Sequence, residues 1–416
     1  MLTELFRQVH SRYSSLPVLG PILDGFAEWL FHLGYRRALV RRHLQGAWHA
    51  DAALQRRGCL SPGHITREAL SACLPKHAED DPNLASTLRL LERYLDAEKV
   101  LWVTRSSQQQ TLLTEYGSYL ETVRGLASPT IAQHQRTSRQ MLDHLHCEVD
   151  PARLGELTRK DIESFVRVSG ERLARRSLQN LVAQLRSFLR FLSGRGQVTA
   201  GLEDQIDTPR VYRAERLPRS LPWGIVQQFL RSIDRTRRLG LRNYAIFLLM
   251  ATYGLRASEV VVLKLNDIEW RAGRIVVPQP KTAQRLVLPL TDGVGQALVD
   301  YLRQARHTLP YREVFLRGRA PAGPLKSTAV TAAFQAWAKR SGLTIPFQGP
   351  HCLRHSYAVH LLRQGVPLKT IGDLLGHRCS ESTCVYIRLA VEDLRDVALS
   401  LPAEANASAA AQRVRS

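Results

Sequence analysis

Near the C-terminus, one short stretch of the chain carries histidine, arginine and tyrosine side chains that together could attack a phosphodiester. The motif HCLRH contains His351 and Arg354, LLGH ends in His377, and Tyr386 follows nine residues later. Arginine neutralises phosphate oxygens through paired hydrogen bonds, and histidine gives or takes one proton near neutral pH. A tyrosine hydroxyl is an oxygen nucleophile that leaves a covalent protein–phosphate bond. The set therefore predicts phosphoryl transfer through a phosphotyrosine.

An arginine lies upstream, at a predicted break between two helices. The segment ATYGLRASEVVVLKL begins as an apolar helix and breaks at Gly254. It is expected to restart with Ser258 as the N-cap, which leaves Arg256 at the junction. A side chain at a helix break can be aimed at a ligand. Glu259, three residues further on, is expected to orient an arginine from behind the site.

A predicted β-hairpin carries a lysine in its turn. Strands are expected over 274–277 and 285–290, where β-branched residues are frequent, and Lys281 lies between them. Only eight of the 58 basic residues are lysines, so a lysine at this point stands out from the arginine background. Lys264 is the fallback, but it falls in the helical stretch SEVVVLKL, where a solvated lysine is the simpler interpretation.

These motifs, in this order and spacing, resemble the tyrosine recombinase family, the phage-integrase and Xer-like site-specific DNA recombinases. The resemblance covers roughly residues 110 to 400. The hairpin reads PKTAQR instead of a glycine-rich turn, which makes its lysine the least secure match. The resemblance implies one active-site set, with the tyrosine as nucleophile: Arg256, Lys281, His351, Arg354, His377 and Tyr386.

The resemblance also implies the reaction. Tyr386 attacks the scissile phosphate, forms a 3′-phosphotyrosine and releases a 5′-hydroxyl, with no metal and no other cofactor. Arg256 and Arg354 hold the non-bridging oxygens and stabilise the transition state. Because free tyrosine has a pKa near 10, its hydroxyl needs help to react at neutral pH.

Proton transfer and oxygen binding are assigned to the remaining members. His351 accepts or relays the tyrosine proton, and His377 donates a hydrogen bond to a non-bridging oxygen. Lys281 is the candidate general acid for the leaving oxygen. His355 is expected only to pack beside the site, and His360 to face the helix surface.

Length and charge agree with a large DNA-binding protein. A chain of 416 residues predicts two or three domains. The net charge of +21 and a pI near 10.3 indicate a polyanionic partner, here double-stranded DNA. The sequence has no long basic amphipathic helix with bulky aromatics and no signal peptide, so we expect a cytoplasmic protein that does not bind membranes.

The cysteines show neither CxxC pairs nor a regular spacing, so they are expected to be reduced thiols. Cys379 and Cys384 flank the tyrosine region and could be mistaken for zinc ligands together with His377. Without a second Cys/His pair, no metal site is predicted. The six cysteines are Cys59, Cys73, Cys147, Cys352, Cys379 and Cys384.

Apolar residues at helical spacing predict a four-helix module between about 110 and 200. Its helices are expected over 116–123, 130–145, 158–166 and 177–192. In the family that the chain resembles, a core-binding, SAM-like domain that grips DNA occupies this place.

The first hundred residues read as a weaker copy of this module. The matching segments are 34–43 with 125–134, 65–70 with 157–162, and 88–95 with 182–189, at offsets that drift from 91 to 94. Such a copy would form a second DNA-gripping or partner-docking module. Its candidate DNA-binding residues are Arg36, Arg37, Arg41 and Arg42.

The expected fold is mainly α-helical, with a small β-hairpin or sheet in a C-terminal catalytic domain that follows N-terminal helical DNA-binding modules. The linker PRVYRAERLPR carries two further candidate DNA contacts, Arg210 and Arg213. The predicted segments are 1–105 for the N-terminal module, 106–208 for the core-binding domain, 209–220 for the basic linker, 221–402 for the catalytic domain and 403–416 for a disordered tail.

The function that the resemblance implies is site-specific recombination by a homotetramer, acting alone or with other recombinase subunits, through a Holliday junction. DNA integration, excision and resolution, above all of a mobile element, all remain open. A type IB topoisomerase shares the tyrosine chemistry but acts as a monomer. Against it stand the two helical modules and a helix expected over 391–399, which in recombinases reaches a neighbouring protomer. A non-catalytic DNA-binding accessory protein would be expected to carry a broken active-site set.

Overall fold

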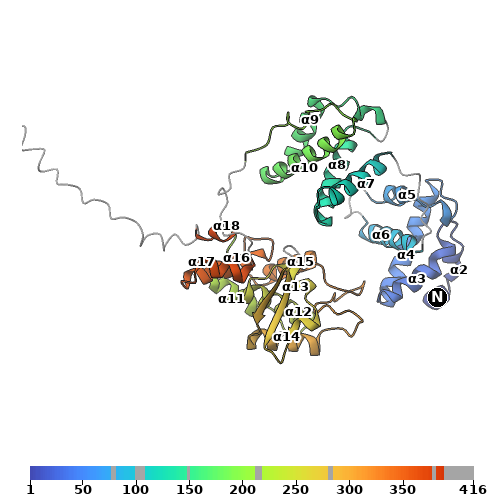
Figure 1. The fold of residues 1–416 in the computed structure, drawn as a ribbon. Coiled ribbons are helices and arrows are strands. Elements are labelled where there is room, and N and C mark those ends of the chain that lie inside the picture. The colour runs from blue at the N-terminus through green and yellow to red at the C-terminus, as the bar shows by residue number, and fades with distance from the viewer. Residues whose placement is uncertain are drawn as a thin grey trace, which may run out of the picture. The chain divides into compact units, whose positions relative to one another are not determined.

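The structure is a computed structural model that describes residues 1–75, 81–98, 108–147, 150–210, 218–279, 284–376 and 381–387. The chain divides into two compact units, Met1–Glu215 and Arg216–Ser416. In Figure 1 the first unit runs from blue to green and the second from green-yellow to red.

The first unit is helical throughout its described part. Its α-helices are α1 (Leu2–Leu5), α2 (His10–Ser14), α3 (Leu23–His32), α4 (Arg37–Gln55), α5 (Arg67–Ala72), α6 (Pro82–Ala97), α7 (Gln108–Thr122), α8 (Ser128–His144), α9 (Arg159–Gly170) and α10 (Arg175–Gly194). Its short 3-10 helices are η1 (Gly20–Ile22), η2 (Pro62–His64) and η3 (Pro151–Leu154).

Two separate hydrophobic clusters form inside this unit, one within residues 2–95 and one within residues 112–206. The second contains the four helices that the apolar spacing predicts. On α10 the buried residues recur every three or four positions, from Leu181 to Leu192, so one stripe of the helix faces the cluster. All four helices extend beyond their expected bounds at one end or both, and α7 begins eight residues early, in a stretch that contains the buried Leu112 and Leu113.

The second unit combines helices with a small sheet. Its helices are α11 (Trp223–Arg231), α12 (Arg238–Tyr253), α13 (Ala257–Val262), η4 (Leu265–Asp267), α14 (Asp292–Gln304), α15 (Ser327–Arg340), α16 (His351–Arg363), α17 (Leu368–Leu375) and α18 (Glu381–Cys384). Its strands are β1 (Ile268–Glu269), β2 (Arg274–Gln279) and β3 (Gln284–Pro289).

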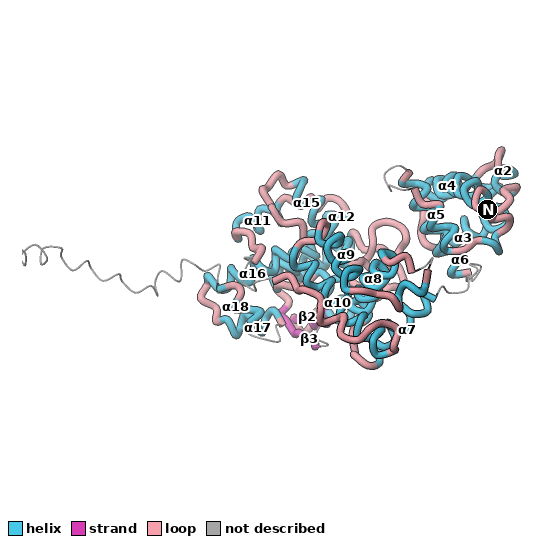
Figure 2. The backbone as a smooth tube through the Cα atoms, turned by 90° about the horizontal axis from the view of Figure 1, so that it is seen from above, coloured by secondary structure: helices cyan, strands magenta, loops and turns pink. Residues whose placement is uncertain are grey.

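The three strands form one antiparallel sheet in the order β1-β2-β3. Ile275 pairs with Leu288 and Val277 with Leu286, so the apolar residues of the two predicted strands lie opposite one another. In Figure 2 the strands occupy one place in a fold that is otherwise helix and loop. The expectation of a mainly α-helical fold with a small sheet in the C-terminal part is therefore confirmed.

The core of the second unit surrounds α12, which is buried along most of its length. Three phenylalanines from α11, α12 and α15 meet there, with ring centroids 5.2 to 5.9 Å apart. This packing fixes the C-terminal end of α12, where the first predicted site residue follows. In the described parts of the chain, no helix has the length and apolar character needed to cross a membrane.

Candidate active site

The helix break after α12 presents Arg256. The chain leaves α12 through Gly254 in the left-handed conformation (φ 64°), where an added Cβ would lie within 3 Å of Leu375 and Tyr357 side-chain atoms. Arg256 itself, not Ser258, occupies the N-cap of α13, so that detail of the prediction is wrong. The reason is the buried Glu259, whose carboxylate accepts from the backbone N–H of Arg256 (2.8 Å) and from its Nη1 (2.6 Å).

Arg354 is buried on the second turn of α16, with 2% of its surface exposed. Its Nη1 donates to the carbonyl of Gly254 and its Nη2 to that of Leu375, both at 2.7 Å. These carbonyls lie at the C-terminal ends of α12 and α17, where backbone acceptors have no partner within their own helix. Burial first, and then the nearby Arg256, lower the pKa of Arg354 to about 10, so it stays charged at neutral pH.

Tyr386 follows α18 and is also buried, with 2% of its surface exposed. Burial raises the pKa of its hydroxyl, while the positive charges of Arg354 and Arg256 and a hydrogen bond with Arg354 oppose the rise. The tyrosine therefore lies close to Arg256 and Arg354, the two arginines that are expected to bind the phosphate. It also remains a protonated hydroxyl at neutral pH, so its reaction requires a proton acceptor.

The ring nitrogen in contact with this hydroxyl belongs to His355. Its Nδ1 lies 3.1 Å from the Tyr386 Oη, and its ring centroid lies 4.5 Å from that of His351. The sequence-based interpretation gave His355 only a packing role. The spacing of His351 and His355, four residues apart on a helix, could have shown that both rings share one face.

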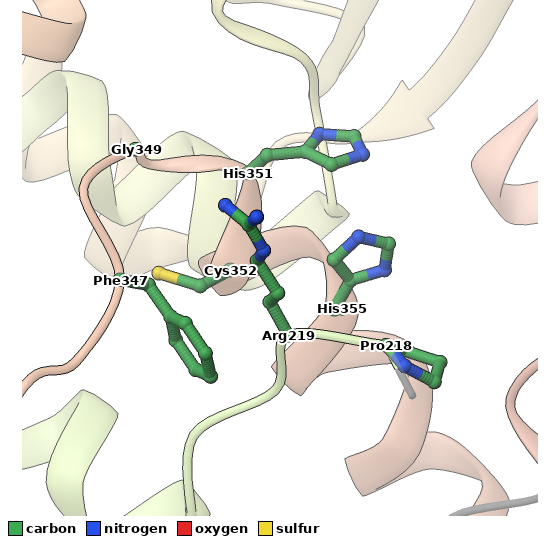
Figure 3. Close-up of a pocket in the computed structure, with 7 residues that line it drawn as sticks. All are labelled: Pro218, Arg219, Phe347, Gly349, His351, Cys352 and His355. Atoms are coloured by element: carbon green, nitrogen blue, oxygen red, sulfur yellow. The ribbon is translucent and has the colours of Figure 1, made fainter. Parts of the chain in front are cut away.

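A cavity of about 300 Å³ opens beside these two histidines. Figure 3 shows their rings on the same side of α16, with the Arg219 side chain beside the start of that helix. Cys352 also lines the cavity, but burial raises the pKa of its thiol to about 12, so it is no nucleophile at neutral pH. His360 is not among the residues that line the cavity; it stacks on Trp223 (4.2 Å between centroids) and is half-buried rather than on the helix surface.

Lys281 and His377 lie outside the described residues. The described residues next to them are nevertheless in contact, because a Cβ added to Gly376 would lie 2.1 Å from the Gln279 side chain. The chain therefore enters the hairpin turn and leaves α17 at the same place. Lys264 is exposed and follows the end of α13 as the N-cap of η4, so its expected helical position is wrong.

The candidate DNA-binding arginines belong to the first unit. Arg36 caps the N-terminus of α4, Arg37, Arg41 and Arg42 lie on its first turns, and all four are exposed. Arg210 is exposed as well, and Arg213 lies outside the described residues.

Two family models match this chain. The phage integrase family model matches residues 225–393, and the phage integrase N-terminal SAM-like domain matches residues 113–196. The first match includes Arg256, Arg354 and Tyr386, and the second spans α7 to α10 except for the first five residues of α7.

Among curated proteins, the putative integrase/recombinase y4rA of Sinorhizobium fredii is 32% identical over 94% of this chain and 97% of its own length. The tyrosine recombinase XerD of Listeria monocytogenes is 31% identical over 69% of this chain and 96% of its own length. A crystal structure of a lambda integrase tetramer bound to a Holliday junction has the same fold, with a TM-score of 0.50 and 19% identity over 70% of this chain and 88% of that one. The chain therefore belongs to the tyrosine recombinase (phage integrase) family, enzymes that cleave and rejoin DNA strands.

Proposed function

We propose that this enzyme recombines DNA at specific sites and that Tyr386 is its nucleophile. The observation that carries the proposal is the convergence of Arg256, Arg354 and His355 on the buried Tyr386 hydroxyl. In the reaction a bond forms between the Tyr386 Oη and phosphorus, and the bond from phosphorus to the 5′-oxygen breaks. The 3′-phosphotyrosine conserves the energy of the phosphodiester, so a second 5′-hydroxyl can reverse the step with a new strand.

The two arginines have different surroundings and so different contributions. Arg256 is oriented by the buried Glu259 and keeps 23% of its side chain exposed, which leaves part of its guanidinium accessible to a phosphate. Arg354 supplies positive charge from a buried position while joining the ends of α12 and α17. Charge held in advance in a site that excludes water stabilises a transition state more than charge in bulk solvent.

We assign the proton of Tyr386 to His355 and extend the relay from there to His351. The Nδ1 of His355 is within hydrogen-bonding distance of the hydroxyl, and the ring of His351 lies against it. Lys281 remains the proposed acid for the 5′-oxygen and His377 a proposed donor to a non-bridging oxygen. The contact between Gln279 and Gly376 supports both roles. It places the start of the hairpin turn and the end of α17 side by side, next to Arg354.

The role of His355 predicts a change in pH dependence. General base catalysis contributes about a hundredfold or more, so we expect His355→Gln to cleave DNA about a hundred times more slowly at neutral pH. Since only the ionised fraction of Tyr386 then reacts, the rate of the variant should rise about tenfold per pH unit below the tyrosine pKa, more steeply than that of the wild type. Single-turnover cleavage rates measured across a pH series test this expectation.

His360→Phe is the matched control for His355. It removes a histidine from the same helix but keeps a ring against Trp223, and the contact with Tyr386 belongs to His355. We expect its pH profile to match that of the wild type. Glutamine can accept a hydrogen bond from Tyr386 but cannot take up its proton. A His355→Gln variant with a normal rate and pH profile would therefore show that His355 only packs against Tyr386.

We further propose that the enzyme works as a homotetramer in the cytoplasm, on a mobile element. The lambda integrase tetramer bound to a Holliday junction and the Tn1549 transposon integrase, a protein of the same fold at a TM-score of 0.51, support the assembly and the setting. The helix expected over 391–399, which would reach a neighbouring protomer, lies outside the described residues.

Site specificity distinguishes this function from relaxation by a type IB topoisomerase. Purified protein can be incubated with a pool of nicked random-sequence duplexes, after which the DNA in covalent adducts is isolated and sequenced. A recombinase should select one shared sequence around the broken bond. Adducts without a shared sequence, together with relaxation of supercoiled plasmid, would favour a topoisomerase, and a complete absence of adducts would favour a non-catalytic accessory protein.

A further inference from the structure

The first unit contains the same succession of elements twice. In each half, two helices are followed by a 3-10 turn and two further helices. The equivalent elements are α3 with α7, α4 with α8, η2 with η3, α5 with α9, and α6 with α10. The packing agrees as well, because the first helix contacts the second, the second the fourth, and the third the fourth in both halves.

Local details recur at nearly constant spacing. Gly34 and Gly125, 91 residues apart, both adopt positive φ between the first and second helices. Thr66 and Thr158 cap the third helices with closely similar backbone angles (φ −107°, ψ 163° and φ −110°, ψ 163°). The repeat therefore extends from helix order to individual turns, and the family model for the SAM-like domain matches only its second half.

A histidine on each second helix, buried for His43 and half-buried for His134, marks the same register. His43 Nδ1 lies 3.1 Å from Thr87 Oγ1, and His134 Nδ1 lies 3.0 Å from the Tyr116 hydroxyl. Burial lowers the pKa of both imidazoles, so both are neutral. With His43 opposite His134, every other position of α4 can be compared with its counterpart on α8.

This register shows that the helix itself does not require arginine at these four places. The second half builds the same helix with uncharged residues at all four places. Arg36, Arg37, Arg41 and Arg42 correspond to Ala127, Ser128, Ala132 and Gln133. The four charges lie exposed within seven residues of a helix that does not require them, and Arg36 and Arg42 have no side-chain partner within the described residues, so a functional reason is needed.

The exposed side of α4 is basic and carries no compensating acid. The one acidic residue of the helix, Asp51, is fully buried and accepts from the backbone N–H groups of Val18 and Leu19. Within the described residues, none of the four arginines pairs with a carboxylate. Arg37 donates to the carbonyl of Glu4, and Arg41 lies over the ring of Phe6 (5.1 Å), which holds both in place.

Trp48 adds an aromatic ring to the same side of α4. It is 40% exposed and lies seven residues after Arg41, two helical turns further along. Arginine charges in a row with an exposed aromatic residue suit the phosphate and sugar surface of nucleic acid.

We propose that residues 1–98 form a second core-binding module whose α4 arginines contact the phosphates of duplex DNA. The proposal goes beyond strand cleavage at Tyr386 and rests on the DNA-directed function proposed above. The contacts would be independent of base sequence, because arginines at phosphates fix position and add affinity without reading bases. The enzyme would thereby hold a longer stretch of duplex than one module can cover.

Salt dependence of binding tests the proposal with the full-length protein. The variant Arg36→Ala/Arg42→Gln places the residues of the second half at two exposed positions without side-chain partners in the described residues. Its affinity for a random-sequence DNA duplex is measured over a salt series. Because each neutralised phosphate steepens the logarithmic salt slope by about 0.9, the loss of two contacts should make it shallower by about 1.8.

A control variant on α6 removes the same charge elsewhere in the module. Arg89→Ala/Arg93→Ser also introduces the residues of the second half, Ala183 and Ser187, and should leave the slope unchanged. Equal salt slopes for both variants and the wild type would overturn the proposal. An equal decrease of the slope in the two variants would also overturn it, because the decrease would then reflect overall charge. Loss of binding to phosphatidylserine vesicles with an unchanged DNA slope would likewise overturn it in favour of a lipid surface.

Adduct formation by the wild-type protein is measured in parallel with nicked duplex. If no adduct forms, the proposed strand cleavage fails, while the salt slope still decides the role of α4.

Discussion

The Tyr386→Phe variant should bind its DNA normally and form no covalent protein–DNA adduct. The substitution removes the only atom that can bond to phosphorus and keeps the ring that is buried against α16 and α17. The lost hydroxyl contacts to His355 and Arg354 should cost about 1 kcal/mol of folding stability each, too little to unfold the unit. Nicked suicide substrates that carry the selected sequence, analysed on a denaturing gel, show the adduct directly.

Tyr357→Phe provides the matched control for the nucleophile. Tyr357 lies on α16, close to Gly254, and burial raises the pKa of its hydroxyl too. Tyr386 differs from it by the contact with His355 and by the nearby charges of Arg354 and Arg256. We expect Tyr357→Phe to form adducts at the wild-type level. An adduct that persists in Tyr386→Phe and disappears in Tyr357→Phe would transfer the nucleophile to Tyr357.

Removal of either active-site arginine should nearly abolish cleavage. Loss of one positioned donor to a developing charge costs on the order of a hundredfold or more in rate, so we expect at least this loss for Arg256→Ala and for Arg354→Ala. The two variants should differ in stability. Arg354→Ala also leaves the carbonyls of Gly254 and Leu375 without donors, and each charged hydrogen bond contributes about 1.5 to 3 kcal/mol.

Cleavage rates per folded molecule separate chemistry from stability. Arg242 is the control, a buried arginine of α12 that donates to Asn243 and to the carbonyl of Leu316, away from Tyr386. Arg242→Ala should lower the unfolding temperature and leave the rate per folded molecule unchanged. Arg354→Lys keeps a charge but cannot span two carbonyls, so it should be slow as well. A fast Arg354→Lys or Arg354→Ala enzyme would contradict a catalytic role for Arg354.

The sequence by itself determined the family, the helical fold with its hairpin and the order of the motifs. These features are local or nearly so. The apolar residues of α10 recur at helical spacing, β-branched residues cluster in β2, and glycine marks the ends of α12 and α17. Each pattern reflects the backbone geometry of a single element, which is why it can be read without knowing what the element packs against.

The tertiary structure decided which side chains meet. Arg354 joins carbonyls that lie 100 and 21 residues away along the chain, and His355 reaches a hydroxyl 31 residues away. Helical periodicity gives the face on which a residue lies but not the partner opposite that face. For the same reason the sequence favoured Ser258 as a cap, by residue type, where the buried Glu259 instead binds the backbone and side chain of Arg256. Contacts between distant segments depend on how α12, α16 and α17 pack together, and only the folded chain fixes that packing.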